Sequence, residues 1–158
     1  MPSPKKSWLL SLLVLLVCNF VISAPRLLAD DAKEVTITAN DQMKYDVTAF
    51  EVKAGQKVTL TFKNIGTLPK TAMGHNFVLL KQGTDVTTFA NAAMAHAAEG
   101  YIPPDMVGMA GVIAFTKLLG PGESDTITFN APVEGVYDYI CTFPGHVILG
   151  MRGKMTVK

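Results

Sequence analysis

Short stretches of alternating apolar and polar residues recur along this chain from residue 33 onward. Val58, Leu60 and Phe62, for example, alternate with threonine and lysine. Because every second side chain of an extended strand points to the same face, each such stretch is predicted to be a strand buried on one side. The alternating stretches are residues 35–38, 58–63, 126–130, 136–141 and 155–157. Several short strands of this kind predict an all-β sandwich.

Turn residues separate these strands, and one segment breaks the pattern. Residues 120–122 place a proline before a glycine, as a type II turn requires. Residues 85–99 are instead rich in alanine and have apolar residues at helical spacing, so a single helix is predicted there, with Thr84 or Asp85 as its N-cap. The two prolines that follow cannot continue a helix, and another strand is expected over residues 112–119.

The first 29 residues have the pattern of a secretory signal. Two lysines precede an apolar run over residues 8–17, and cleavage is expected after Ala29 or, alternatively, after Ala24. An uncleaved membrane anchor is the other interpretation, but the run is short for a bilayer span of about 20 residues. Residues 30–158 would then form one exported domain of ordinary size.

The charge balance excludes one class of function. The full chain has 14 basic and 13 acidic residues, and loss of residues 1–29 would leave 11 basic residues against 13 acidic ones. A slightly acidic domain without a basic cluster is not expected to bind nucleic acid. Of the two cysteines, only Cys141 lies outside the predicted signal, so its thiol is expected to have a special role.

Cys141 begins the most informative motif of the chain. It opens Cys-Thr-Phe-Pro-Gly-His, which ends at His146 and is followed by Met151, while His75 lies far upstream in Met-Gly-His-Asn. Soft sulfur ligands suit Cu(I), and imidazole binds copper in both oxidation states. Two histidines and a cysteine with a weak axial methionine are the ligand set of blue-copper electron-transfer sites. We therefore predict that these four residues bind one copper ion.

Neighbouring residues are expected to support this site. Gly74 allows its backbone to approach the metal closely, so its carbonyl is a candidate weak axial ligand. Asn76 can hydrogen-bond across to the loop that carries the cysteine, and Thr142 is placed to complete that bond. Phe143 and Leu149 are expected to exclude water and to tune the reduction potential. Rigid loops would let copper change its oxidation state with little rearrangement, as an electron carrier requires.

Several longer segments make the chain resemble the azurin family of blue (type-1) copper proteins. They are residues 40–43, 68–70, 73–76, 116–120 and 141–146, and the likeness covers residues 34–158. The resemblance implies a cupredoxin fold, which is a Greek-key β-sandwich of eight strands with one helical flap. It also implies a periplasmic protein that carries single electrons between redox proteins. We expect a monomer that is not an enzyme and has no small-molecule substrate.

The resemblance also implies roles for individual residues. His75, Cys141 and His146 would be the equatorial ligands, with Met151 and the Gly74 carbonyl in axial positions. The backbone N–H groups of Asn76 and Phe143 would point at the cysteine sulfur. The ring edge of His146 would be exposed within an apolar patch on which cytochrome or copper-protein partners dock. That patch would comprise Leu68, Met73, Phe143, Pro144 and Ile148.

Three features depart from azurins. His146 and Met151 are separated by one residue more than in azurins, a spacing more like that of auracyanins and plastocyanins, so an altered loop and potential are expected. The cysteines of the azurin disulfide are missing, with Gly55 near one of the matching places. Phe77 stands where azurins usually have a buried tryptophan, and the single tryptophan, Trp8, lies in the predicted signal.

Two other functions could use the same ligands. An electron-feeding module of a larger multicopper enzyme would need further histidines, and apart from His75 and His146 the chain has only His96, which is predicted to lie on the helix surface. A copper storage or delivery protein would need exchangeable ligands, for which the methionines within residues 94–109 are a weak indication. Steady turnover would favour the enzyme, and rapid copper loss to a mild chelator would favour delivery.

Overall fold

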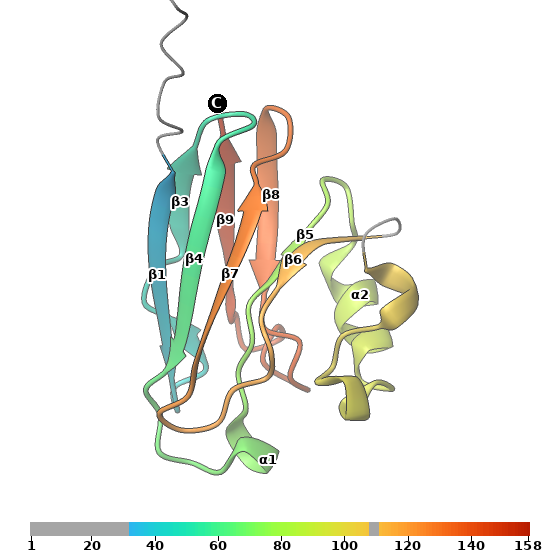
Figure 1. Ribbon diagram of the computed structural model, residues 1–158. Helices are drawn as coiled ribbons and strands as arrows, with labels where there is room; N and C mark the ends of the chain where they lie inside the picture. Colours follow the sequence, from blue (N-terminus) through green and yellow to red (C-terminus); the bar gives the residue numbers. More distant parts are fainter. Residues whose placement is uncertain (1–31, 108–110) are drawn as a thin grey trace, which may run out of the picture.

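The computed structural model describes residues 32–107 and 111–158, which form two packed β-sheets with a helical segment beside them (Figure 1). The predicted signal, residues 1–29, and Met109 lie outside the described residues. Within the described ranges, no helix has the length and apolar character of a membrane span.

The two sheets face each other as a sandwich, as predicted. One sheet has the strand order β2-β1-β4-β7 and the other β3-β9-β8-β5-β6. The strands are β1 (Lys33–Asn40), β2 (Lys44–Tyr45), β3 (Ala49–Val52), β4 (Lys57–Asn64), β5 (Val78–Leu80), β6 (Val112–Phe115), β7 (Ser124–Asn130), β8 (Gly135–Ile140) and β9 (Arg152–Val157). The short strands β2 and β3 pair with different sheets, β2 with β1 and β3 with β9, so the chain crosses between the sheets there.

The alternating residues form the core between the sheets. Val58, Leu60 and Phe62 of β4 are fully buried, and β1 buries its apolar residues in the same way, while the intervening threonines face outward or are half-buried. The predicted type II turn is also present, because the Glu123 N–H bonds to the Gly120 carbonyl and Gly122 has a positive φ of 75°. Local sequence pattern therefore accounts for most of the sandwich.

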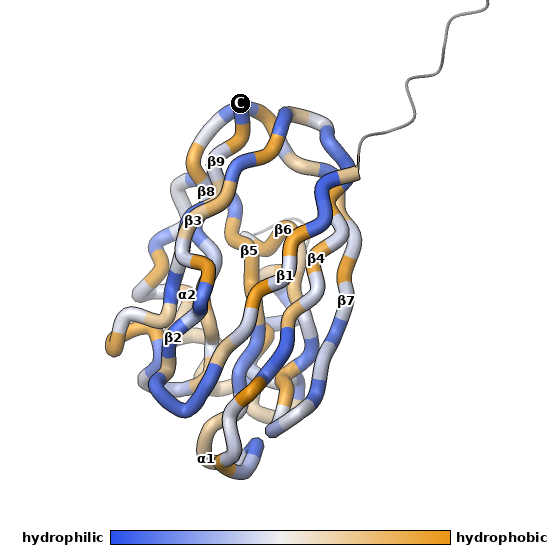
Figure 2. Tube along the Cα trace, turned by 90° about the vertical axis from the view of Figure 1, so that its left-hand side faces the viewer, coloured by the Kyte–Doolittle hydropathy of each residue, from blue (hydrophilic) through white to orange (hydrophobic). Residues whose placement is uncertain are grey.

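β5 differs because all three of its residues are buried. Leu79 belongs to the core between the sheets, whereas Val78 and Leu80 belong to a second apolar cluster with Phe89 of helix α2 (Val86–Ala93). The helical segment thus packs on the outer side of β5, and the hydropathy colouring shows β5 as a continuous apolar stretch (Figure 2). Asp85 caps α2 by accepting a 2.7 Å hydrogen bond from the Thr88 N–H.

The helix predicted over residues 85–99 is shorter than expected. It ends at Ala93, and a separate 3₁₀ turn, η1 (Ala97–Glu99), follows it; a second one is η2 (Pro104–Met106). The apolar stripe of α2 buries Phe89 and Ala93, but most side chains from residue 94 to residue 99 are exposed. Without a buried face there is little packing to extend the helix.

The strand predicted over residues 112–119 is also shorter, since β6 ends at Phe115. The Lys117 N–H bonds instead to the side chain of Asp125, and Leu119 pairs with His75 outside the regular strands. These residues therefore leave the sheet and run toward the end of the sandwich that carries short helix α1 (Lys70–Met73) (Figure 1).

Candidate metal centre

The structure brings His75, Cys141 and His146 together at one end of the sandwich. The Cys141 Sγ lies 3.9 Å from the Nδ1 of His75 and 3.3 Å from the Nδ1 of His146. All three donor atoms lie within 4.8 Å of one another. His75 and Cys141 are fully buried and His146 is 2% exposed, so water has almost no access to the cluster.

The spacing and chemistry of these donors fit a single copper ion. With metal–sulfur and metal–nitrogen bonds of about 2.3 and about 2.0 Å, ligands arranged trigonally around one ion would place sulfur and nitrogen about 3.7 Å apart. The two observed separations, 3.9 and 3.3 Å, lie on either side of that value. One thiolate with two imidazoles in a dry site is a soft donor set that favours copper.

His75 belongs to the histidine segment, residues 73–76, which runs from the last residue of α1 toward β5. Its backbone makes two hydrogen bonds to Leu119, of 2.7 and 3.1 Å. The Leu119 carbonyl also accepts a 3.0 Å bond from the side chain of Asn64, at the end of β4. The position of His75 is therefore fixed by residues distant in sequence.

Gly74 has a structural reason to lack a side chain. Its φ of −68° is accessible to any residue, so conformation does not require glycine. A Cβ atom there would lie only 2.7 Å from the Lys70 carbonyl oxygen and 3.0 Å from Leu118. Close packing against α1, rather than backbone freedom, thus explains this glycine.

Cys141 begins the cysteine loop, residues 141–151, which joins β8 to β9. Met151 donates a 2.9 Å hydrogen bond to the His146 carbonyl, and Gly150 donates one of 3.0 Å to Val147. Together with the positive φ of Gly150, 89°, these bonds form a Schellman motif at the end of a helical turn. The four residues between His146 and Met151 match this motif, which explains how the longer spacing is accommodated.

Asn76 links the two segments. Its side-chain Oδ1 accepts a 2.8 Å bond from the Thr142 N–H, and its Nδ2 donates a 2.7 Å bond to the Thr142 hydroxyl. The same Nδ2 lies 3.1 Å from the Gly100 carbonyl, which follows η1. The histidine segment, the cysteine loop and the helical flap are thus tied together by one amide.

Burial controls the protonation of the cluster. It raises the pKa of the Cys141 thiol to about 12, although the backbone N–H groups of Asn76 and Phe143 bond to the sulfur and oppose the rise. It lowers the pKa of His146 to about 4, with a further contribution from the charge of His75, and it also lowers the pKa of His75. Both imidazoles are therefore neutral at pH 7, as metal binding requires. The thiol is protonated in the absence of metal and would release its proton when the sulfur binds a metal ion.

Met151 is fully buried in the same apolar cluster as Cys141, and its carbonyl accepts a 3.2 Å bond from the Cys141 N–H. The Phe143 ring, which is partly buried, lies 4.8 Å from the ring of His146 and so covers it. Leu149 was expected to exclude water as well, but it is 59% exposed. The shielding therefore comes from Phe143 and the core rather than from Leu149.

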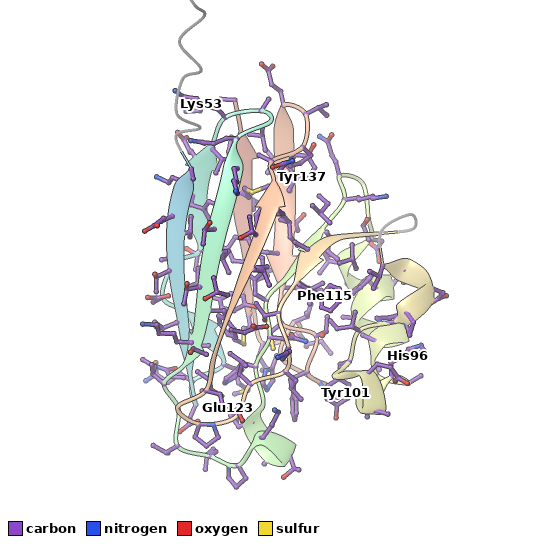
Figure 3. The ribbon with its side chains drawn as sticks, viewed as in Figure 1. Lys53, His96, Tyr101, Phe115, Glu123 and Tyr137 are labelled. Carbon is purple, nitrogen blue, oxygen red and sulfur yellow. The ribbon has the colours of Figure 1, made fainter. Side chains whose placement is uncertain are left out.

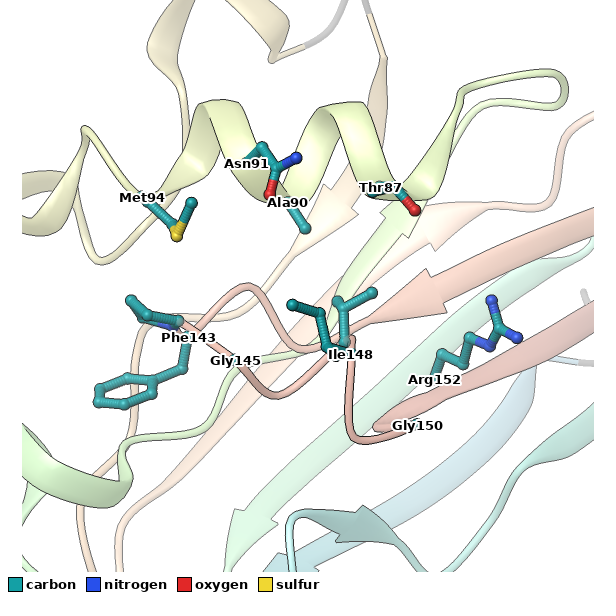
Figure 4. Close-up of a pocket in the computed structure, with 11 residues that line it drawn as sticks. Thr87, Ala90, Asn91, Met94, Phe143, Gly145, Ile148, Gly150 and Arg152 are labelled. Atoms are coloured by element: carbon teal, nitrogen blue, oxygen red, sulfur yellow. The ribbon is translucent and has the colours of Figure 1, made fainter.

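Three of the five residues expected to form an apolar patch are exposed, whereas Met73 and Phe143 are partly buried. Ile148 is 83% exposed and Leu68 is 44% exposed, while Pro144 is also exposed. Beside them a groove of about 360 Å³ separates α2 from the cysteine loop, with Met94 on one wall and Phe143 and Ile148 on the other (Figure 4). His146 itself is only 2% exposed, with the Phe143 ring against it, so the ring edge that was expected to be exposed is almost fully covered.

His96 does not join the cluster. It lies beyond the end of α2, on the outer side of the helical flap (Figure 3), where its Nδ1 is 3.7 Å from a Glu99 carboxylate oxygen. This agrees with the surface position predicted for it.

Other supporting residues could not be found from the sequence. Leu119 fixes the backbone of His75, Gly100 accepts from Asn76, and the Tyr45 hydroxyl bonds to the Asn76 carbonyl. Each contact joins residues at least 24 positions apart, so no local spacing predicts it.

Comparison with known proteins agrees with this geometry. Residues 32–158 match the family model of copper binding proteins, plastocyanin/azurin family. The chain is 38% identical over 130 residues to an azurin of Pseudomonas fluorescens biotype C, covering 79% of this chain and 98% of that one. It is 38% identical over 120 residues to auracyanin-B of Chloroflexus aurantiacus, covering 75% of this chain and 49% of that one.

A solved structure of a related copper protein also has a similar fold. Reduced auracyanin from Roseiflexus castenholzii superposes with a TM-score of 0.72 at 39% identity, covering 80% of this chain and 97% of that one. The predicted cupredoxin fold and the predicted copper cofactor are therefore confirmed. The chain belongs to the plastocyanin/azurin family of copper-binding proteins, blue copper proteins that transfer electrons.

Proposed function

We propose that this protein carries single electrons between redox proteins through one copper ion bound by His75, Cys141, His146 and Met151, with the Gly74 carbonyl as a weak axial contact. The observation that supports this most directly is the convergence of one sulfur and two Nδ1 atoms in a buried cluster. Copper in such a site supplies a reversible change between Cu(I) and Cu(II). The hydrogen-bonded loops would hold the ligands in place during that change.

The visible and electron paramagnetic resonance spectra of the copper-loaded protein test this ligand set. We expect an intense thiolate-to-copper band and reversible one-electron reduction, and we expect Cys141→Ser to abolish the band. A colourless copper-loaded protein, or a Cys141→Ser variant with the same colour, would contradict the proposal. Replacing Met151 by Leu should keep the colour but change the spectrum if the thioether is an axial ligand.

The role proposed here is that of a carrier and not of an enzyme, with electrons entering and leaving through the apolar patch near His146. The support is the exposure of Ile148, which lies two residues after His146 in the cysteine loop, and the exposure of Leu68, another residue of the expected patch. A partner would need to approach only this patch to come near the copper ligands. The expected partners are cytochromes or other copper proteins, and the protein is proposed to be a monomer.

A charge placed in this patch should slow electron transfer. We expect Ile148→Lys to lower the electron self-exchange rate by about tenfold or more, because two patches meeting face to face would bring like charges together. Val133→Lys is a matched control, since Val133 is 74% exposed on the connection between β7 and β8. Equal rates for the two variants would show that the patch is not the electron port.

We further propose that residues 1–29 direct export to the periplasm and are then removed, leaving residues 30–158 as the functional domain. The lysines and apolar run at the N-terminus support this. Mass spectrometry of protein from the periplasmic fraction should find a chain that begins at residue 30 or, with the alternative cleavage, at residue 25. Such a chain lacks Trp8, so tryptophan fluorescence from the mature protein would contradict the processing.

A further inference from the structure

Tyr45 places a buried hydroxyl group next to the metal centre, and the ligand set does not use it. Its side chain is 4% exposed, and its ring lies 5.8 Å from the ring of Phe62 and 5.5 Å from that of Tyr139. The hydroxyl donates a 2.6 Å hydrogen bond to the backbone carbonyl of Asn76. Because β2 belongs to the sheet opposite β5, this bond crosses the sandwich.

The bond acts on the residue that connects both ligand segments. The Asn76 side chain is bonded to Thr142 and to Gly100, and its backbone N–H bonds to the Cys141 sulfur. The Tyr45 hydroxyl bonds to the backbone carbonyl of the same residue. With its side chain and its carbonyl both bonded, the Asn76 N–H has little freedom to turn away from the sulfur.

We propose that Tyr45 is a positioning residue that raises the reduction potential of the bound copper by holding Asn76 in place; this rests on the function proposed above. An N–H directed at the thiolate stabilises negative charge on the sulfur, which weakens its donation to Cu(II) and favours Cu(I). Loss of the Tyr45 hydroxyl should therefore favour the oxidised state, because Asn76 would be held less firmly.

Tyr45 itself is not placed to exchange electrons. Its hydroxyl donates to an amide carbonyl, which is too weak a base to take the proton that an oxidised tyrosine would release. Burial, with a smaller contribution from the charge of Cys141, raises the pKa of Tyr45 well above its usual value, so the hydroxyl stays neutral. The group therefore acts through its hydrogen bond.

Tyr45→Phe in the copper-loaded protein tests the proposal, because it removes only the hydroxyl. We expect a lower potential, with the equilibrium constant for reduction by a fixed one-electron donor falling by up to about tenfold, which corresponds to about 59 mV. Tyr139→Phe is the matched control, since its hydroxyl donates to the Val47 carbonyl and does not bond to Asn76. This control should keep the potential of the unchanged protein.

An unchanged potential in Tyr45→Phe, or an equal fall in Tyr139→Phe, would overturn the proposal. In either case the copper-loaded wild-type protein would still be blue. Failure of the proposal for Tyr45 can therefore be distinguished from failure of the proposed function. Nuclear magnetic resonance of the Cu(I) form gives a test that needs no variant. The Tyr45 hydroxyl proton is expected to exchange slowly with solvent, and rapid exchange would also overturn the proposal.

Discussion

The two segments that carry the proposed ligands are held in different ways. The cysteine loop contains three of the four ligands and is shaped by hydrogen bonds within residues 141–151, among them the Schellman motif at Gly150. The histidine segment contributes His75 and depends on contacts with Leu119, Thr142 and other residues far away in the sequence. A loop held by hydrogen bonds between its own residues should tolerate substitutions elsewhere in the protein. A segment held by contacts with distant residues should be displaced when one of those contacts is lost.

Removal of the Asn76 side chain should have the largest effect. Asn76→Ala leaves the buried Thr142 N–H without its partner and breaks the link between the segments. Each buried polar group that loses its partner costs about 1–3 kcal/mol, so we expect the free energy of unfolding of the copper-free protein to fall by at least about 2 kcal/mol. Urea denaturation measures this change.

The same variant should also weaken copper binding, because His75 would no longer be held against the cysteine loop. Thr142→Val is a partial control, since it removes the hydroxyl but keeps the N–H bond to Asn76. We expect its effect to be smaller than that of Asn76→Ala. If the two variants lose equal stability, the backbone bond does not contribute as argued.

Acidification should destabilise the copper-free protein through both segments. Burial lowers the pKa of His75 and that of His146, the latter to about 4, from an unfolded value near 6.5. Between these pH values the unfolded chain binds protons that the folded protein does not. The stabilising contribution is therefore present above about pH 6.5 and is lost as the pH falls toward about 4, which thermal unfolding across that range should detect.

His146→Phe should remove part of this pH dependence, because the chain would then lose one of its two buried imidazoles. A copper-free protein whose melting temperature does not change between pH 7 and pH 5 would contradict the expectation.

A methyl group at Gly74 should disturb the histidine segment. The Cβ atom would lie 2.7 Å from the Lys70 carbonyl oxygen, which is backbone and can move only if α1 shifts. Overpacking of this kind typically costs about 1–3 kcal/mol, and we expect a similar loss of stability for Gly74→Ala. A spectrum of the copper-loaded variant that is identical to that of the unchanged protein would argue against close coupling of α1 to the site.

The corresponding change in the cysteine loop should be milder. A Cβ atom at Gly150 meets nothing within 4 Å, so Gly150→Ala is opposed only by the positive φ of 89°. The cost of a left-handed conformation for alanine is about 1–2 kcal/mol, which is less than the largest loss expected for Gly74→Ala. Urea denaturation of this variant beside Gly74→Ala would show which segment is more sensitive to a single methyl group.

Much of the sandwich could be predicted from the sequence, because the alternation in residues such as Val58, Leu60 and Phe62 is a local property of a strand. The end of α2 and the end of β6 could not. Helical spacing continues past Ala93, but no core surface is present to bury the next turn. The alternation from Val112 likewise does not predict that the residues after Phe115 leave the sheet to bond with Asp125 and to pair with His75.

The chemistry of the centre could be inferred from the sequence, because a cysteine, two histidines and a methionine limit the metals that can be bound, and three of these residues lie in one short loop. How His75 meets that loop, and which groups hold it there, became clear only from the folded structure. Leu119, Thr142 and Tyr45 reach the histidine segment through packing of the two sheets. Contacts between residues 31 to 66 positions apart depend on the whole fold and leave no local pattern in the chain.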